Sequence, residues 1–301
     1  MARVLVVGSV AYDTVETPAG KEEDLLGGSA VYFSLAARLF STVAVSGVVG
    51  EDFAEEDREL LRSASVEVDC LETVPGGRTF RWHGRYHEDM NRRDTVSVAL
   101  NVLEDFRPVL PERHLRTPFV FLANGATATQ LAVLEQVAPY RPVVYFDTMN
   151  LWIETEREGV LELLRRTDGV VLNDGEARVL TGRGNLLAAC RALREMGAGD
   201  VVVKKGEHGL LALLGDAGLV ALPAFPLEEV KDPTGAGDAF AGAFMATLAR
   251  AGGRGKRRAL AAAVVTASFC VETFGAGGLL ALDAGAFERR LAQYRELCRT
   301  A

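Results

Sequence analysis

Short apolar runs recur along the chain, separated by helix-like segments. The runs are rich in valine and contain few polar residues, which is typical of parallel strands buried on both faces. They lie at 3–9, 42–50, 118–125, 142–148, 169–174 and 200–206. The helix-like segments include 30–40, 129–140, 157–167 and 185–197. This alternation predicts an α/β fold in which helices cover both sides of a mostly parallel sheet, a three-layer α/β/α sandwich.

One region has a different period. From Phe80 to His87 aromatic and charged side chains alternate, which predicts a half-exposed antiparallel strand. Segments 67–74 and 95–100 are expected to pair beside it, with a turn at 75–77. We therefore predict a single domain over 1–301 that carries a small β-sheet lid, formed by about 11–26 and 67–100.

Composition narrows the classes of function. With 49% hydrophobic and 25% charged residues the chain is typical of a globular protein, and its net charge of −8 argues against a nucleic-acid partner. No segment has the length and apolarity of a membrane span or signal peptide, so we expect a cytoplasmic protein without a membrane partner. The cysteines form no CxxC pair and are expected to be reduced and buried: Cys70, Cys190, Cys270 and Cys298.

Residues 231–244, "KDPTGAGDAFAGAF", carry the strongest chemical signal. A turn at Pro233 and flexible glycines lead into a helix whose N-terminus is suited to binding a phosphate group. Asp238 stands where a carboxylate could accept the proton of a hydroxyl that attacks phosphorus. The alternative is a tight turn before a packing helix, in which Asp238 only stabilises the helix dipole.

Motifs in four places together resemble the ribokinase/PfkB family of carbohydrate kinases. They are "DPTGAGDAFAGAF" (232–244), "GGSAVYFSLAARL" (27–39), "VLNDGEARVLTG" (171–182) and "VVVKKGEHGLLAL" (201–213). The resemblance spans nearly the whole chain. It implies a ribokinase-like fold and transfer of the γ-phosphoryl group of ATP to a hydroxyl of a sugar or sugar derivative.

The resemblance implies a catalytic centre in the C-terminal motif. Asp238 would be the base, and the backbone of Gly235, Ala236 and Gly237 would form the anion hole. Asn173 and Glu176 would organise Mg²⁺ and the nucleotide phosphates, mostly through water. Asp232 would help to hold a monovalent cation such as K⁺, or would simply cap the turn. Further nucleotide-binding positions would be Lys205, Gly206, Gly209, Gly275 and Gly277.

The resemblance also implies an acceptor site. Asp13 would bind substrate hydroxyls, and Gly27 and Gly28 would allow the backbone to approach the substrate. Tyr32 stands where the family often has Asn, a departure that weakens a plain ribose-kinase assignment. Asn124 is a further candidate for the pocket wall. The lid contributes Arg81, Arg85, Tyr86 and Asn91, of which the arginines could equally lie on the wet face of the lid.

The sequence favours a sugar as the acceptor and keeps a nucleoside as the alternative. Polar candidates such as Asp13, Asn124 and Arg85 favour a sugar, whereas aromatic residues could form a shelf for a nucleobase: Tyr32, Phe33, Trp82, Tyr86 and Trp152. A non-catalytic sensor is a remote alternative that the presence of Asp238 disfavours. A dehydrogenase and a Walker-type NTPase are excluded because their glycine motifs are absent.

Two further expectations concern the lid. His83 and His87 would share one face of a strand about 13 Å apart, which is too far for a common metal ion. The exposed edge of the lid could pair with a second subunit, which would give a homodimer.

Overall fold

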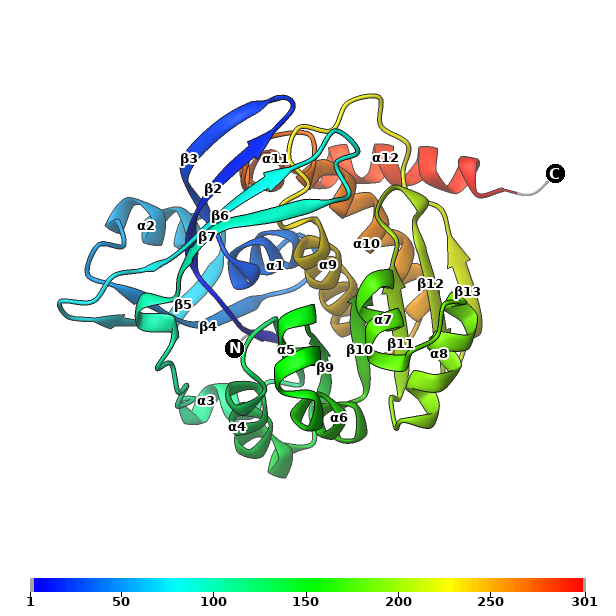
Figure 1. The fold of residues 1–301 in the computed structure, drawn as a ribbon, viewed down its shortest axis with the longest axis horizontal. Coiled ribbons are helices and arrows are strands. Elements are labelled where there is room, and N and C mark those ends of the chain that lie inside the picture. Colours follow the sequence, from blue (N-terminus) through cyan, green and yellow to red (C-terminus); the bar gives the residue numbers. More distant parts are fainter. Residues whose placement is uncertain (1–2, 300–301) are drawn as a thin grey trace.

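The computed structural model describes residues 3–299, which form two β-sheets and the helices that pack on the larger one (Figure 1). The large sheet has nine strands in the order β13-β12-β11-β10-β9-β8-β1-β4-β5. Their bounds are β1 Val4–Val7, β4 Val43–Gly50, β5 Val66–Val74, β8 Phe119–Leu122, β9 Val143–Asp147, β10 Gly169–Asn173, β11 Asp200–Lys204, β12 Leu210–Leu214 and β13 Gly218–Leu222. All neighbours pair in parallel except at the β11–β12 and β12–β13 junctions.

Helices cover both faces of this sheet. One face carries α1 (Ser29–Ala37), α2 (Glu55–Ser63), α9 (Ala236–Arg250), α10 (Lys256–Cys270), α11 (Gly277–Ala281) and α12 (Ala284–Leu297). The other carries α4 (Thr127–Val137), α5 (Asn150–Thr155), α6 (Arg157–Arg166), α7 (Asp174–Thr181) and α8 (Leu186–Glu195), and the short α3 is Glu112–Leu115. The sheet divides two cores because side chains alternate along a strand: Val4 and Val6 face one core, Leu5 and Val7 the other. The three-layer fold expected from the sequence is confirmed.

The small sheet forms the lid, with the order β3-β2-β6-β7. Its strands are β2 (Ala11–Thr17), β3 (Gly20–Gly27), β6 (Phe80–Tyr86) and β7 (Arg93–Ala99). In Figure 1 these blue and cyan ribbons stand above the end of the large sheet. The segment 67–74, expected in the lid, lies instead in β5 at the edge of the large sheet, paired in parallel with β4. The reason is that Val66 and Val68 of β5 bury their side chains in the same core as Val4 and Val6.

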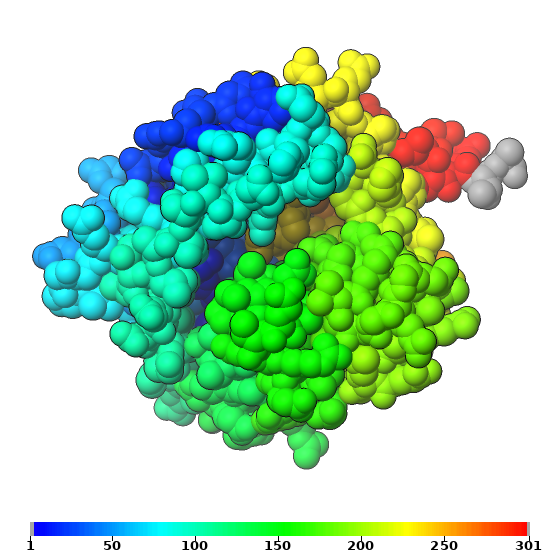
Figure 2. Space-filling model, in the orientation of Figure 1, coloured from blue at the N-terminus to red at the C-terminus, as the bar shows by residue number. Residues whose placement is uncertain are grey.

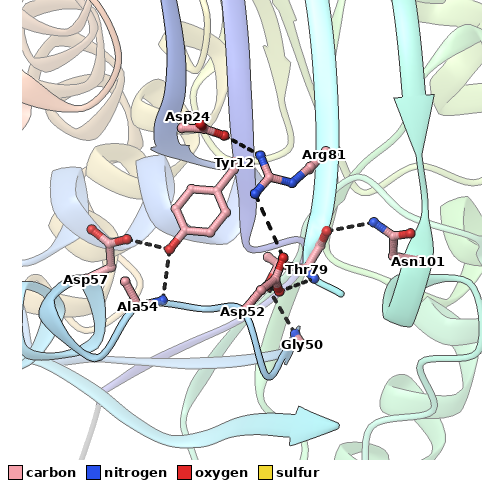
Figure 3. A network of polar contacts seen from close by, with 9 residues as sticks. All are labelled: Tyr12, Asp24, Gly50, Asp52, Ala54, Asp57, Thr79, Arg81 and Asn101. Atoms are coloured by element: carbon pink, nitrogen blue, oxygen red, sulfur yellow. Dashed lines mark hydrogen bonds and ion pairs between the residues drawn. The ribbon is translucent and has the colours of Figure 1, made fainter. Parts of the chain in front are cut away.

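A polar network fastens the base of the lid to α2 and to the loop between β4 and α2 (Figure 3). The Tyr12 hydroxyl donates to Asp57 (2.6 Å) and accepts from the Ala54 N–H (3.0 Å). Arg81 lies between two carboxylates, those of Asp24 and Asp52, as Figure 3 shows. The lid is therefore anchored at one end by β2 and β6.

Two other expectations can be compared with the fold. Within residues 3–299 no helix is long and apolar enough to cross a membrane. Of the cysteines, Cys70, Cys190 and Cys270 are free and buried, as expected. Cys298 is free but exposed, because it follows the last turn of α12, so its predicted burial is wrong.

Candidate active site

The candidate residues gather where the carboxyl ends of the large sheet's central strands face the lid. In this region the surface is hollowed between the cyan lid strands and the green segments below them, and the gold atoms of α9 are visible at the bottom (Figure 2). Open parallel sheets bind ligands at this end of their strands. The lid and the strand ends thus enclose the hollow from two sides.

The N-terminus of α9 lies at the centre of the candidate site. Its first N–H groups have no partner within the helix and can face an anion. Gly235 caps the helix in the left-handed conformation (φ 74°), and a Cβ there would lie 2.2 Å from the Tyr32 ring. Asp238 follows in the first turn, and the Ala236 N–H donates weakly to the Pro233 carbonyl (3.3 Å). Gly235, Ala236, Gly237 and Asp238 therefore form the cap and first turn of α9.

Tyr32 has a different place from the one expected. Its side chain is 1% exposed and its ring packs beneath Gly235 instead of lining an acceptor pocket. The hydroxyl has no hydrogen-bond partner, and burial raises its pKa well above the usual value. Tyr32 therefore supports the helix N-terminus from below.

Two charged residues that the sequence analysis did not single out lie beside Asp238. Asp147 ends β9 and Lys204 ends β11, with 3.6 Å between the carboxylate Oδ2 and Nζ. Burial raises the pKa of Asp238, and the charges of Lys204 and Arg93 oppose that rise. The pKa of Asp147 is also raised by burial, and its Oδ1 has no partner. Their position at the last residue of a buried strand was the signal that could have identified them.

Asn173 and Glu176 form a capping box at the start of α7. The Glu176 carboxylate accepts from the Asn173 N–H (2.7 Å), and the Asn173 side chain accepts from the Glu176 N–H (2.8 Å). Burial raises the pKa of Glu176, while Lys204 opposes that shift. These contacts fix both side chains beside the Asp147–Lys204 pair.

Asp232 is completely buried at the turn before α9. Its two oxygens accept from the N–H groups of Thr234 (2.8 Å) and Gly275 (2.9 Å). Burial raises its pKa, and these hydrogen bonds oppose the rise. Asp232 therefore ties the loop at Gly275 to the turn before α9, and the neighbouring Gly277 begins the short helix α11.

The loop 205–209 connects β11 to β12 and contacts the lid. Its Lys205 N–H donates to the Gly209 carbonyl (2.8 Å), and Gly206 and Gly209 both have positive φ. The Asn91 amide, at the tip of the lid, donates to Glu207 (2.9 Å). The lid tip thus touches the loop that the sequence assigned to the nucleotide.

On the acceptor side, Asp13 lies against the two glycines predicted with it. A Cβ on Gly27 would lie 2.0 Å from the Asp13 carboxylate, and the Gly28 N–H donates to it at 3.4 Å. Burial raises the Asp13 pKa to about 7, assisted by the negative charges of Asp232 and Asp238. Asp13 therefore lies close enough to Asp232 and Asp238 for their charges to raise its pKa.

Asn124, the second residue after β8, is the other candidate for the wall of the acceptor site. Its side-chain carbonyl accepts from the indole N–H of Trp152 (3.0 Å), and its amide nitrogen faces the sulfur of Met149 at 3.2 Å. A thioether is only a weak acceptor, so this donor retains capacity for a ligand. The Trp152 contact fixes which way the amide points.

The lid arginines divide into two groups. Arg85, predicted to contact substrate, pairs with Glu16 (2.6 Å), and its side chain is 58% exposed. Arg93, not singled out from the sequence, lies near Tyr86, Asp238 and Glu176. The lid therefore presents Arg93, and not Arg85, to the carboxylates of Asp238 and Glu176.

Comparison with known proteins identifies a family whose model matches this sequence. The model of the pfkB family carbohydrate kinases matches residues 1–281. The chain belongs to this family. It is 31% identical over 254 residues to a cytidine kinase of Thermococcus kodakarensis, covering 83% of this chain and 90% of that protein. It is 26% identical to a fructokinase of Klebsiella pneumoniae, covering 93% and 96% of the two chains.

Solved structures show the same fold. A proposed ribokinase II of E. coli in complex with ATP and Mg²⁺ superposes with a TM-score of 0.80 at 19% identity, covering 97% of this chain and 100% of that one. The ribokinase-like fold and the family expected from the sequence are confirmed. This pfkB family member is a kinase whose family relatives phosphorylate sugars and nucleosides.

Proposed function

We propose that this kinase uses ATP to phosphorylate a nucleoside. The observation that carries the proposal is the wall formed by Asn124, Met149 and Trp152, in which one directed amide is set between apolar groups. Nucleobases are bound by such walls, because flat apolar surface holds the ring and a few fixed polar groups select its edge. The similarity to a cytidine kinase supports this choice over the free sugar favoured from the sequence.

The proposed reaction follows from the arrangement around α9. The acceptor oxygen donates an electron pair to the γ-phosphorus, its proton passes to Asp238, and the bond from the γ-phosphorus to the bridging oxygen breaks with its electrons leaving on ADP. The first N–H groups of α9 and the ammonium of Lys204 face the charge that develops. Asp13 would hold the sugar hydroxyls of the nucleoside in line with the phosphoryl group.

The residues present fit Mg²⁺ bound with ATP. Asp147 has a buried oxygen without a partner and Glu176 is buried beside it, so a divalent cation would stabilise both as anions. We propose that these two residues, with Asn173, hold the ion largely through water, where it would neutralise phosphate charge. The ATP·Mg²⁺ complex of the similar E. coli protein supports this assignment.

A substrate panel tests the acceptor. With ATP and Mg²⁺, kcat/KM for cytidine, uridine or adenosine should exceed that for ribose and fructose by at least about 10-fold. Asn124→Leu should lose most of the nucleoside preference, whereas Asn185→Leu, a surface substitution at the cap of α8, is the matched control. A higher kcat/KM for a free sugar would overturn the nucleoside assignment.

A free sugar is the second candidate acceptor. It is favoured by Asp13, a buried carboxylate that can accept two hydroxyls, and by the similarity to a fructokinase. The same panel decides, since this reading predicts that ribose or fructose is turned over and nucleosides are not.

Two finer proposals accompany the function. If a K⁺ ion binds beside Asp232, kcat should be higher in KCl than in choline chloride at equal ionic strength.

A homodimer through the lid is supported by the exposed apolar side chains Val96 and Val98 on β7, 46% and 53% exposed. Sedimentation of wild type and Val98→Glu tests it, and a wild-type monomer would rule it out.

A further inference from the structure

Among the arginines of strands β6 and β7 and of the hairpin that joins them, Arg93 is the one without a carboxylate partner in the described part of the chain. Arg81 pairs with Asp24 and Asp52, Arg85 with Glu16, and Arg92 with Asp89. Arg93 forms no ion pair within 4.0 Å in the part of the chain described, residues 3–299. It remains accessible to solvent, so an incoming anion can reach it.

The inner face of the lid is shaped to position this guanidinium. The indole of Trp82 packs against Gly84, where a Cβ would come within 1.9 Å of the ring. The guanidinium carbon of Arg93 lies over the same indole, 5.2 Å from the ring centroid. The indole N–H points away to Thr95 (3.3 Å). Stacking on an indole orients a guanidinium while leaving its N–H donors free.

A second contact places the Arg93 end of the lid against the catalytic turn. Arg93 is the cross-strand partner of Tyr86, whose hydroxyl accepts from the Thr234 hydroxyl at 3.2 Å. Thr234 directly precedes Gly235, the cap of α9. The positive charge of Arg93 lowers the pKa of Asp238, Glu176 and Asp13 against the effect of burial, which dominates at each. Arg93, from the lid, and Lys204, from the end of β11, therefore both act on the carboxylates of Asp238 and Glu176.

We propose that Arg93 is a catalytic residue that donates hydrogen bonds to the phosphoryl group in transfer, with Trp82 as the positioning residue that holds it. As the bond to the bridging oxygen of ATP breaks and the bond to the acceptor oxygen forms, negative charge spreads over the equatorial oxygens, and a planar donor fork matches that geometry. This inference rests on the proposed location of phosphoryl transfer at α9, and it holds for either acceptor class.

Kinetics of Arg93→Met tests the proposal, using the acceptor with the highest kcat/KM in the panel. We expect kcat to fall by about 10²-fold or more, with the dissociation constant of ATP changed by less than about 3-fold. Arg93→Lys should recover part of the loss and guanidinium chloride should partly rescue Arg93→Gly, which a merely structural role would not allow. Arg85→Met is the matched control, since its partner is Glu16, and should keep kcat within about 2-fold.

A binding measurement without turnover provides a second readout. Arg93→Met should weaken the complex of ADP, aluminium fluoride and acceptor by at least about 10-fold while leaving ADP binding unchanged. An unchanged kcat, or a loss confined to acceptor KM, would overturn the proposal. Phosphorylation of sugars only would contradict the nucleoside assignment and would leave this test intact.

Discussion

The N-terminal turn of α9 and the β6–β7 hairpin of the lid face each other across the same hollow, yet they are built in opposite ways. From Ala239 to Ala246 every residue of α9 is buried, and Gly235 is locked against the Tyr32 ring. In β7 every residue is exposed. A dense core holds one side of the site, and a few polar and stacking contacts hold the other.

The difference matches the separate tasks of α9 and of the lid. A phosphoryl-transfer centre requires donors at fixed positions, which a buried helix supplies. A cover that admits substrate and excludes water has to open, and segments with little buried surface open at low free-energy cost. Substitutions in α9 should therefore abolish chemistry, and substitutions in the lid should mostly change binding, with Arg93 as the exception.

The largest effect is expected at Asp238. Asp238→Asn removes the proposed base and should lower kcat by about 10³-fold or more while ATP binding, measured by calorimetry, stays within a few-fold of wild type. Asp216→Asn, a surface carboxylate 55% exposed, is the control. Turnover near the wild-type rate in Asp238→Asn would show that another group accepts the proton.

A substitution at Gly235 tests whether the backbone conformation of this residue holds the N-terminal turn of α9 in place. Gly235→Ala forces a side chain into the left-handed region and against Tyr32, so we expect the free energy of unfolding to fall by roughly 2 kcal/mol or more and kcat by at least about 10-fold. Gly184→Ala is a control, because nothing lies within 4 Å of its added Cβ. Equal unfolding midpoints in urea for both variants would contradict this account.

The N-terminal turn of α9 could be predicted from the sequence in detail, and the lid only in outline: its strands within 11–26 and 80–100 were expected, but not which of its side chains face the site. Residues 231–244 form one contiguous turn and helix, so local rules and the family resemblance located Gly235 and Asp238 together. The buried strands were found because period and valine content are local as well. The segment 67–74 was misplaced because its alternating pattern suits the edge of either sheet, and only pairing with β4 decides.

Arg93, Asp147 and Lys204 were missed for a related reason. Their roles depend on neighbours far away in sequence: Arg93 on Trp82 and the α9 turn, Asp147 on Lys204. Arg85 was expected at the substrate because nothing in the sequence indicates its ion pair with Glu16. Charge partners across a sheet have no signature in a single sequence.

Asp13 lies on lid strand β2, and the charges of Asp232 and Asp238 before and within α9 act on it. Its raised pKa predicts that stability depends on pH. Its folded-state pKa of about 7 exceeds the value of about 3.9 for an unfolded Asp. Between these values the folded state retains a proton that the unfolded state has released. The stability associated with the raised pKa is therefore fully present below about pH 4 and is lost as the pH rises through 7.

Urea unfolding at pH 5 and pH 8 checks this sign. Wild type should lose roughly 2–3 kcal/mol more than Asp13→Asn between the two values. Acceptor KM should fall in wild type as the pH passes 7, because the ionised carboxylate accepts two hydroxyls, and should be higher and flat in Asp13→Asn. Parallel unfolding profiles would place the Asp13 pKa near its ordinary value.

The smallest effect is expected at the lid tip, where Asn91 donates to Glu207. An exposed hydrogen bond contributes about 0.5–1 kcal/mol, so Asn91→Ala should raise KM for ATP by about 2- to 4-fold with kcat nearly unchanged. Glu207→Gln keeps an acceptor and should behave like wild type. In the double variant Asn91→Ala/Glu207→Ala the effects should not add, because both remove the same contact. Additive effects would mean that the contact does not couple lid closure to the nucleotide loop, and that the lid is held over the site only by its aromatic and arginine face.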